Sequence, residues 1–417
     1  MAESDKHTST VVLPASHGAP PSLRPLRSAF VQVYLDHAAG GPPHPAAVEA
    51  MVGWLSSGYG NPSGAHHVSR LARKAIDDAR DEVAGFLGFT SGGIIFTSGG
   101  TEADNLAVLG PLADRRGAIV ASAVEHPAVL EAARASGREV RLLGVGEDGL
   151  VDLDQLSSLL DADVALVSVQ AANHETGVIQ DLEAVARRVR RRAPGALFHS
   201  DAVQAAPWMD LPSVLRCVDM ASVSGHKLGG PQGVGALAVR PHVALSPILH
   251  GGGQERRRRS GTQNVAAAIG LAAAMRARGA MRGDGDVTGV RVATLRDRLC
   301  ATLLGAVPDA VASGVGAGRV PGHCHMRFPG VEAEALLFLL DEAGVCASAG
   351  AACASGAFEP SPVLMAMGVS KREAGSCLRL TLGPDTSEEE VDFAGEAIVS
   401  CVTRLAGSSG EREVLAR

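Results

Sequence analysis

The chain has 417 residues, of which 46% are apolar and 20% are charged, and its net charge is −7. This balance is typical of a globular protein of two or three domains, while the weak negative charge and the 3% of aromatic residues exclude a nucleic-acid-binding surface. No apolar run approaches the ~18 residues of a membrane span, and seven cysteines without a CxxC pair argue against a disulfide framework and favour a cytoplasmic protein.

The first 30 residues carry early charges and several prolines but no apolar signal-peptide core, so we expect a disordered tail there. From about residue 80 to 270, short apolar runs alternate with helical stretches. The apolar runs, which we expect to be strands, cover residues 94–97, 118–122, 164–169, 197–199 and 218–223. The helical stretches include 101–109, the residues after Pro127, and 181–192. Because the runs are continuously apolar, they predict parallel strands covered on both faces, and hence an α/β fold with a mainly parallel sheet.

Polar residues directly follow the carboxyl ends of four of these runs. They are His126, Asn173, Asp201, Ser224, His226 and Lys227. Open α/β sheets bind ligands at that edge. One polar residue would fall there by chance in many proteins, but six across four strand ends predict a ligand site.

After about residue 283 the pattern changes, which predicts a second domain reached through an Ala/Arg-rich helical stretch at 271–300. In this part of the chain we expect helices over 291–304, 362–368 and 387–405, and a strand over 322–328. The Gly/Ala/Ser-rich residues 347–358 are expected to form a loop.

Lys227 and Asp201 could together serve a cofactor. A lysine in a crowded site can lose its proton and condense with an aldehyde. Asp201 could keep a pyridinium nitrogen protonated, so that the ring acts as an electron sink. Taken alone, the lysine would more often be a surface ammonium and the aspartate would as readily be a helix cap. Their joint placement favours the cofactor.

The junction at residues 98–101 (SGGT) could bind a phosphate through its backbone N–H groups and the positive end of the following helix. The same residues could form a plain turn, and the absence of a Gly-Lys-Ser/Thr signature argues against a nucleoside triphosphate. His126, between Glu125 and Pro127, could stack on a cofactor ring or move protons, or it could be a capping or buried histidine.

Cys353 lies in the Gly/Ala/Ser loop, where little apolar sequence surrounds it, so we interpret it as an exposed thiol that can reach a substrate and then a partner. Four other cysteines fit the usual role of small core residues: Cys217, Cys300, Cys377 and Cys401. Arg379, in an alternating run, could bind the carboxylate of an amino-acid substrate bidentately, or it could form a surface ion pair.

Two further clusters receive no chemical role. His323 and His325 share one face of the expected strand while Cys324 points away, and with no further ligands nearby we predict no metal site. The basic runs at 188–192 and 256–259 are typical of solvated surface, although an arginine of the second run could approach a phosphate.

Taken in order, these residues resemble the class V aminotransferases and, among them, the cysteine desulfurases of the NifS type. The resemblance runs from about Tyr34 to Leu405. Each piece is short, but the ordered set is highly specific. The pieces are 34–39 (YLDHAA), 60–63 (GNPS), 96–102 (FTSGGTE), 125–126 (EH), 201–204 (DAVQ), 224–227 (SGHK), 251–256 (GGGQER), 260–262 (SGT) and 359–361 (EPS).

The resemblance implies the PLP-dependent aminotransferase-like fold (fold type I). A large domain, 48–282, would bind pyridoxal 5'-phosphate on a mainly parallel seven-stranded sheet. A smaller α+β domain, 283–417, would carry the cysteine loop, and residues 31–47 would join this small domain. The resemblance also implies a homodimer in which Thr262 reaches the phosphate bound by a second subunit.

The same resemblance implies roles for single residues. Lys227 would hold the cofactor, Asp201 would pair with its ring nitrogen, Gln204 would contact its phenolic oxygen, and His126 would stack on its ring. The residues implied to bind the phosphate are Gly100, Thr101, Ser224, His226 and Thr262. Arg379 would clamp the substrate carboxylate, with Asn173 and His174 as further contacts to substrate and, for His174, to the cofactor.

Cys353 would attack the sulfur of the bound L-cysteine, which leaves L-alanine and a persulfide on Cys353. The longer loop running into residues 359–361 resembles the branch of the family that hands sulfur to acceptor proteins. The sequence leaves the acceptor open: an iron–sulfur scaffold, a tRNA-thiolation protein or a dedicated biosynthetic carrier.

Four departures from the family pattern keep alternatives open. His174 replaces the second asparagine of the usual Asn-Asn-Glu, residues 40–41 (GG) replace two threonines, and Pro384 replaces an arginine. Residues 348–353 (SAGAAC) lack two serines of the common desulfurase loop and also look like selenocysteine lyases. A selenocysteine lyase and a non-catalytic sulfur carrier or scaffold with a decayed pocket are therefore the alternative hypotheses.

Overall fold

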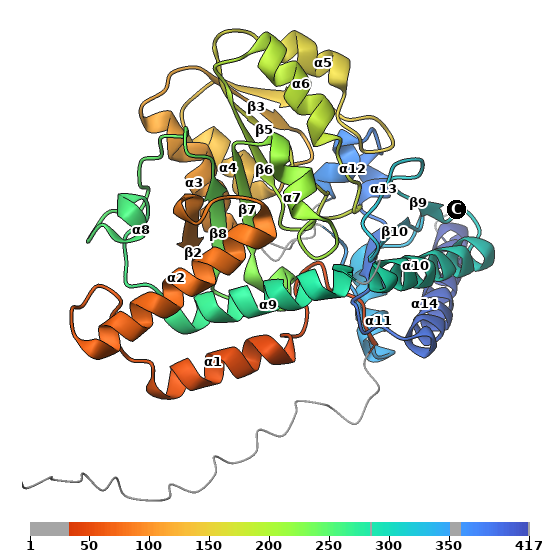
Figure 1. The fold of residues 1–417 in the computed structure, drawn as a ribbon. Helices are drawn as coiled ribbons and strands as arrows, with labels where there is room; N and C mark the ends of the chain where they lie inside the picture. Colours follow the sequence, from red (N-terminus) through yellow and green to blue (C-terminus); the bar gives the residue numbers. More distant parts are fainter. Residues whose placement is uncertain (1–32, 284–285, 351–359, 416–417) are drawn as a thin grey trace, which may run out of the picture.

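The computed structural model describes residues 33–283, 286–350 and 360–415, and Figure 1 shows them as two units joined through long helices. The tail expected at 1–30 lies outside the described residues. In the part of the chain that is described, no helix combines the length and the apolar character needed to cross a membrane.

The larger unit is built on a seven-stranded sheet with strand order β2-β8-β7-β6-β5-β3-β4. Its strands are β2 (Ile94–Thr97), β3 (Ala118–Ser122), β4 (Val140–Leu143), β5 (Val164–Ser168), β6 (Leu197–Asp201), β7 (Met220–Ser224) and β8 (Gly235–Val239). Strand β8 runs antiparallel to β2 and β7, and the other pairs are parallel. The predicted α/β fold with a mainly parallel sheet is confirmed.

Two apolar cores cover this sheet, one on each face, and successive residues of a strand point alternately into them. Ile94 and Phe96 belong to the first core, and Ile95 between them belongs to the second. The first core is completed by α2 (His67–Leu87), α5 (Leu153–Leu159), α6 (Leu182–Arg192), α7 (Leu211–Val214) and α9 (Val265–Gly283). The second is completed by α3 (Gly100–Leu109) and α4 (Pro127–Ala135). Burial on both faces is why these strands read as unbroken apolar runs.

Strands β4 and β8 had no counterpart among the expected elements. Strand β4 lies at the edge of the sheet, and three of its four residues are partly or fully exposed, so its sequence shows no apolar run. Strand β8 consists of small residues and follows β7 after a short turn around residues 225–234. That turn is too short for a crossover helix, which is why β8 runs antiparallel.

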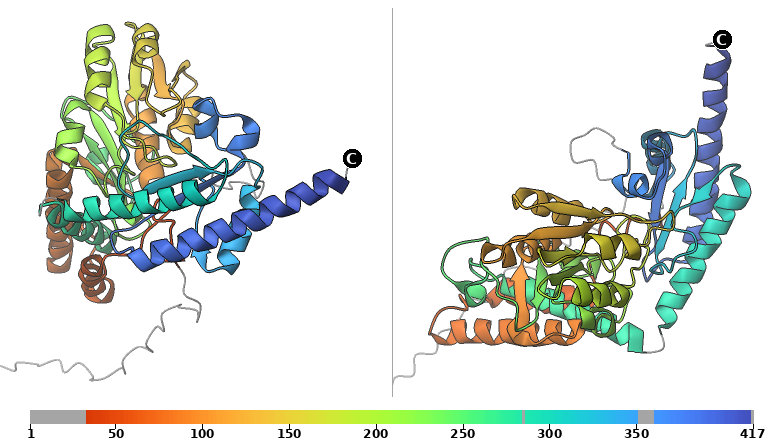
Figure 2. Two further views of the ribbon diagram at one scale, coloured as in Figure 1. Left: turned by 90° about the vertical axis from the view of Figure 1, so that its right-hand side faces the viewer. Right: turned by 90° about the horizontal axis from the view of Figure 1, so that it is seen from above.

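The smaller unit contains a three-stranded antiparallel sheet, β12-β10-β9, formed by β9 (Val311–Ala312), β10 (His323–Arg327) and β12 (Cys377–Thr381). Its core is completed by α10 (Val287–Ala306), α11 (Ala333–Glu342) and α14 (Glu388–Leu415). Figure 2 shows α14 running beside α10 along the outside of this unit. Strand β1 (Val33–Tyr34) pairs in parallel with β11 (Val345–Cys346), so Val33 and Leu35 enter the same core.

Three further helices are short: α8 (Gln254–Arg257) lies before α9, and α12 (Pro362–Ala366) and α13 (Lys371–Ala374) lie at the junction of the two units. Helix α1 (Pro45–Ser57) packs on α9. The helical stretch expected at 271–300 is found as two helices. It is divided between α9 and α10, and the Asp286 side chain caps α10 by accepting a hydrogen bond from the Gly289 N–H. The domain boundaries given above stay a prediction.

Candidate active site

Lys227 lies one turn after β7, and its amine points at the main chain of residues 38–39. Its Nζ donates to the carbonyl oxygens of Ala38 and Ala39, the second at 2.8 Å. Burial, with Arg379 as a further cause, lowers the pKa of Lys227 to about 8, against the opposing charges of Asp36 and Asp201. Because the amine loses its proton near physiological pH, it can act as a nucleophile and as a base.

Asp201 ends β6, and the residue is buried, with 7% of its surface exposed. The Val203 N–H donates to Asp201 Oδ1 at 2.8 Å. Burial raises the pKa of Asp201, while His126 and Lys227 pull it down. A buried carboxyl held between two basic groups is well suited to pair with a protonated ring nitrogen.

Sequence reasoning missed further buried titratable groups behind Asp201. Burial, with the charge of Asp201 as the next cause, raises the pKa of Asp104 and of Glu125 well above the ordinary range. Asp104 Oδ1 and Glu125 Oε2 have no hydrogen-bond partner among the described residues.

His199 is a buried histidine on β6, the strand that ends at Asp201. Its ring nitrogens bond to the hydroxyls of Ser168 and Ser222 at 2.9 Å each, and its Nε2 lies 3.7 Å from Asp104 Oδ1. The sequence could have indicated His199, because it lies two residues before Asp201 and therefore on the same face of the strand.

His126 caps α4, and this fixes which ring nitrogen carries its proton. The Ala128 N–H donates to His126 Nδ1 at 3.1 Å, so the neutral ring is protonated at Nε2. Burial lowers the pKa of His126, with Asp201 opposing and Lys227 assisting. The ring therefore exchanges protons through Nε2 alone, which makes the capping and the proton-transfer interpretations compatible.

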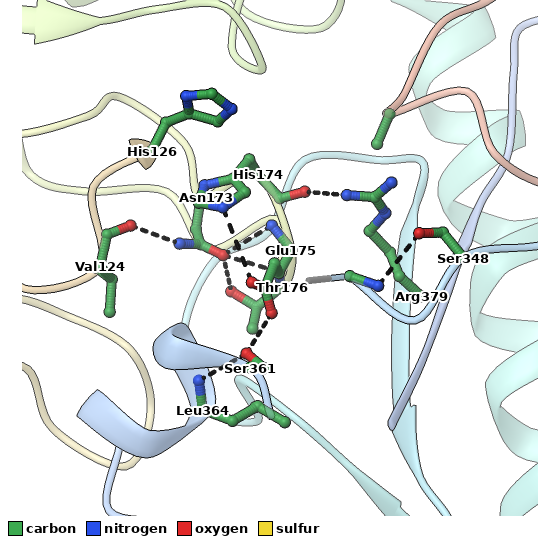
Figure 3. Close-up of polar contacts among 12 residues, drawn as sticks. Val124, His126, Asn173, His174, Glu175, Thr176, Ser348, Ser361, Leu364 and Arg379 are labelled. Atoms are coloured by element: carbon green, nitrogen blue, oxygen red, sulfur yellow. Dashed lines mark hydrogen bonds and ion pairs between the residues drawn. The ribbon is translucent and has the colours of Figure 1, made fainter. Parts of the chain in front are cut away.

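The turn at residues 173–176 presents His174 to His126 (Figure 3). The two rings lie edge to face, with centroids 5.1 Å apart and planes at 74°. Burial, followed by the charges of His126, Arg379 and Lys227, lowers the pKa of His174 well below its ordinary value. His174 is therefore neutral at physiological pH, and its Nδ1 has no partner within the described ranges.

The Asn173 side chain holds this turn together. Its Oδ1 accepts from the N–H groups of Glu175 and Thr176 and from the Thr176 hydroxyl, and its Nδ2 donates to the Val124 carbonyl at 3.2 Å (Figure 3). The Asn173 oxygen and one of its two N–H donors are thus used within the protein, and a direct contact of Asn173 with substrate stays a prediction. His174 is the residue of this turn that faces His126.

The phosphate-binding turn expected at residues 98–101 begins α3 and lies against β7. A side chain at Gly100 would come within 3.1 Å of Val203 Cγ2 and 3.3 Å of Ser224 Cβ. The Ser224 hydroxyl and His226 Nδ1 are 3.0 Å apart. Thr101 is exposed at the same helix start. Backbone N–H groups of a helix N-terminus and a serine–histidine pair together form an anion-binding surface.

Gln204 and Thr262 occupy different surroundings. Gln204 Nε2 donates to the Ala38 carbonyl at 2.8 Å, which is the same oxygen that accepts from Lys227. Thr262 is exposed on the segment between α8 and α9, and no contact to the other site residues involves it in the described part of the chain. Its role therefore depends on a second subunit and stays a prediction.

Arg379 reaches the site from the smaller unit. Leu378 and Leu380 of β12 enter the core of that unit, so Arg379 between them points the opposite way. Its Nη2 donates to Asp36 Oδ1 at 2.9 Å and its Nη1 to the His174 carbonyl at 3.1 Å, while Nε has no partner among the residues described. Cys353 lies outside the described residues.

A cavity of about 430 Å³ opens beside these groups between the two units. Lys227 and Gln204 line it from the larger unit, and His323 and Thr381 line it from the smaller one. His323 and His325 are buried on β10, and Cys324 between them points into the opposite core, as the strand pattern predicts. Within the described residues no cluster of three or more His, Cys, Asp or Glu side chains could hold a metal ion.

Comparison with known proteins gives one consistent family. The model of the "Aminotransferase class-V" family matches residues 33–393. The chain is 40% identical over 379 residues to a "Cysteine desulfurase" of Nostoc sp., covering 89% of this chain and 93% of that protein. It is 42% identical over 385 residues to the "IscS-like cysteine desulfurase" of Mycobacterium tuberculosis, covering 89% and 96%.

Solved structures agree with the sequence relatives. A "NIFS-LIKE PROTEIN" superposes with a TM-score of 0.82 at 33% identity, over 89% of this chain and 99% of the other. The NifS-like protein from Rickettsia africae superposes with a TM-score of 0.80 at 31% identity and the same coverage. The matched region contains the side chains discussed above.

Proposed function

The chain belongs to the aminotransferase class-V family and is a cysteine desulfurase, and we propose that the residues gathered at its sheet edge move sulfur from L-cysteine to Cys353. The observation that carries this proposal is the grouping of Lys227, Asp201 and His126. Each of the three contributes to the pKa of another, so they share one buried space.

The residues around Lys227 fit pyridoxal phosphate, the cofactor of this family. Asp201 offers a buried carboxyl to the ring nitrogen, and the turn of Gly100 with Ser224 and His226 offers donors to the phosphate. Burial and the charge of Asp201 raise the pKa values of the neighbouring Asp104 and Glu125 and favour their neutral forms, so Asp201 is the carboxylate of this cluster that can pair with a positively charged ring nitrogen. When bound, the cofactor supplies an electron sink that makes the bonds around the α-carbon of an amino acid breakable.

The protein's own groups then bind the substrate and handle its protons. The Lys227 amine, partly neutral near pH 8, accepts the α-proton and returns a proton to the product. His126 exchanges protons through Nε2 over the same space. Arg379 binds the substrate carboxylate in place of part of its contact with Asp36, and its unpaired Nε is ready for a bidentate contact.

The sulfur step needs a thiolate as nucleophile. The Cys353 sulfur forms a bond to the substrate sulfur, and the carbon–sulfur bond breaks with its electron pair left on the carbon skeleton. That carbon takes up a proton to become the methyl group of L-alanine, and Cys353 keeps the transferred sulfur as a persulfide. An acceptor protein then receives this sulfur by a second thiolate attack.

We also propose that the protein is a homodimer in a reducing cytoplasm. Helix α1 carries the exposed apolar residues Val48, Val52 and Leu55 at helical spacing, and Tyr59, two residues after the helix, is 85% exposed. Thr262 is exposed as well, as a contact with a partner subunit requires. The six described cysteines are all free thiols. A molar mass equal to one chain in light scattering would contradict the dimer.

The experiment that tests the function measures L-alanine and sulfide from L-cysteine with the full-length protein and with Cys353→Ala. We expect the wild type to form both products when a thiol reductant is present, and Cys353→Ala to form neither at a comparable rate. Equal rates in the two proteins would contradict the persulfide role. Running the same pair on selenocysteine separates the alternative function, because a selenocysteine lyase would be active with selenocysteine and nearly inactive with cysteine.

A further inference from the structure

Glu175 is a buried carboxyl that lies beside Gly350 and Ser361, which precede and follow residues 351–359 in the sequence. Its side chain is 1% exposed. The Ser361 hydroxyl donates to Glu175 Oε2, as Figure 3 shows. On the other side, a side chain at Gly350 would come within 3.1 Å of Glu175 Oε2. Gly350 and Ser361 are therefore brought to the same carboxyl group.

Both of these neighbours are themselves fixed. The Ser361 hydroxyl accepts from the Leu364 N–H at 3.0 Å and so caps α12. Gly350 has a φ of +86°, and its N–H donates to the Ser348 hydroxyl at 3.2 Å. Ser348 in turn pairs with the Arg379 main chain through two hydrogen bonds. Only a glycine combines this φ with such a close approach to a carboxyl.

Glu175 is also tied to the larger unit. Its N–H donates to Asn173 Oδ1 at 2.9 Å, and the Asn173 amide is anchored to the Val124 carbonyl. The same turn presents His174 to His126. One short turn of the larger unit therefore sets the His126–His174 pair on one side and the contacts to Gly350 and Ser361 on the other.

The charges around Glu175 make these contacts sensitive to pH. Burial raises the pKa of Glu175 to about 7, against the Ser361 hydrogen bond and Arg379, which lower it. His174 Nε2 lies 3.8 Å from Glu175 Oε1 and is neutral. Cys377, on β12, is neutral too, because burial and the charge of Glu175 raise the pKa of its thiol to about 12. Arg379 is thus the cation that faces this carboxyl.

We propose that Glu175 is a positioning residue for sulfur transfer, whose carboxyl binds Ser361 and packs against Gly350, and so holds these two residues, between which Cys353 lies in the sequence, relative to the His126–His174 pair. The part that concerns sulfur rests on the proposed function. The part that concerns the contacts of Glu175 stands without it.

The pH dependence has a definite sign. In the closed arrangement, in which the Glu175 carboxyl is buried beside Gly350 and Ser361, its pKa is about 7. In an open arrangement, in which water reaches the carboxyl, its pKa falls toward the ordinary 4.5. The closed arrangement therefore binds more protons, and its advantage falls as the pH rises from 4.5 to 7 and is constant above 7. Between pH 5 and pH 8 this shifts the opening equilibrium on the order of tenfold to a hundredfold.

The test is hydrogen–deuterium exchange of residues 344–350 and 361–366 at pH 5 and pH 8, corrected for the intrinsic rate. In the wild type we expect local opening to increase on the order of tenfold to a hundredfold between the two pH values. Glu175→Gln, neutral at every pH and able to bond to Ser361, should show no such increase. Glu175→Leu fills the space without a hydrogen bond, so it should open more than Glu175→Gln at both pH values.

A matched control lies on the next helix. The hydroxyl of Ser370, which caps α13, donates to the Glu373 carboxylate as the hydroxyl of Ser361 donates to Glu175, but Glu373 is not buried. Glu373→Gln should therefore exchange like the wild type at both pH values. If the wild type shows no more pH dependence than Glu175→Gln, the positioning role of Glu175 is overturned.

The catalytic readout separates this role from the general function. Glu175→Leu should lower kcat for L-alanine by about ten- to a hundredfold, because small displacements of a reacting group have effects of that size. Its KM for cysteine and its cofactor content should stay at the wild-type values. Glu175→Gln should keep its kcat at pH 8. If exchange follows the expected pattern while the wild type forms no L-alanine, the proposed function fails and the contacts of Glu175 stand.

Discussion

The two sides of the active site are built in opposite ways. On the side of the larger unit, Asp104, Asp201 and Glu125 crowd together, and two of their buried oxygens have no partner among the described residues. On the side of the smaller unit, Ser361 donates to Glu175 and Arg379 donates to the His174 carbonyl, and both contacts cross the junction to the larger unit. The first side is a cluster of buried carboxyls within one unit. The second side is a set of hydrogen bonds that depend on how the two units meet.

Replacing Lys227 should have the largest effect, because it removes the reactive amine that lies beside the buried carboxyls of the larger unit. Lys227→Ala should lower L-alanine formation by about a thousandfold or more, since the loss of a proton-transferring group alone removes about 10²–10⁴-fold. It should also release the cofactor on gel filtration, which the visible absorbance of the protein would report. Lys74→Ala, at an exposed lysine paired with Asp78, is the control and should retain both properties. A coloured, active Lys227→Ala protein would contradict the assignment.

Arg379→Lys should have an intermediate effect and tests the side of the smaller unit. Lysine keeps the charge and the pairing with Asp36 but cannot make a bidentate contact to a carboxylate. A charge-assisted hydrogen bond contributes about 1.5–3 kcal/mol, so KM for cysteine should rise roughly ten- to a hundredfold. Initial rates over a range of cysteine concentrations would measure this. The same substitution at Arg298, whose partners Glu388 and Asp392 are on the surface, should leave KM unchanged. An unchanged KM in Arg379→Lys would place the substrate carboxylate elsewhere.

Glu125→Gln should have the smallest effect, seen in stability and only at higher pH. Burial raises the pKa of Glu125 above 4.5, so the folded wild type holds a proton that the unfolded chain has lost. The free energy of unfolding of the wild type therefore falls as the pH rises above about 4.5, by at most about 1.4 kcal/mol per pH unit from this group. The variant should lose less stability than the wild type between pH 5 and pH 8 in urea unfolding. Parallel pH profiles would show that Glu125 is not held protonated by the fold.

The sequence predicted the larger sheet well because its strands are buried on both sides. Ile94, Ile95 and Phe96 alternate between two cores, so every position had to be apolar and the run was visible. Strand β4 was missed because an edge strand needs no such run, and its exposed residues look like a loop. The gathering of His126, Asp201 and Lys227 followed from the geometry of parallel strands, which end at one edge.

Other parts of the site could not be predicted because their partners are far away in the sequence. Ser361 lies 186 residues from Glu175, and nothing local to either residue indicates the contact. The Asn173 amide holds its own turn and donates to the Val124 carbonyl, 49 residues away in the sequence, and nothing local to either residue indicates that contact. The burial of Asp104 and Glu125 depends likewise on the packing of whole elements and not on their neighbours in sequence.

The pairing of β1 with β11 has a consequence for how the chain folds during its synthesis. The N–H groups of Val33 and Leu35 donate to the carbonyls of Gly344 and Cys346, and the Leu35 carbonyl accepts from Thr381. These contacts close a loop of more than three hundred residues, so the ribosome must deliver the chain through residue 381 before the smaller core can form. Until then residues 33–36 have no partner strand, and the larger sheet can assemble without them. Asp36, which bonds to Arg379, takes its place in the same late step, so the enzyme becomes competent to bind a carboxylate only when residues 33–36 have met β11 and β12.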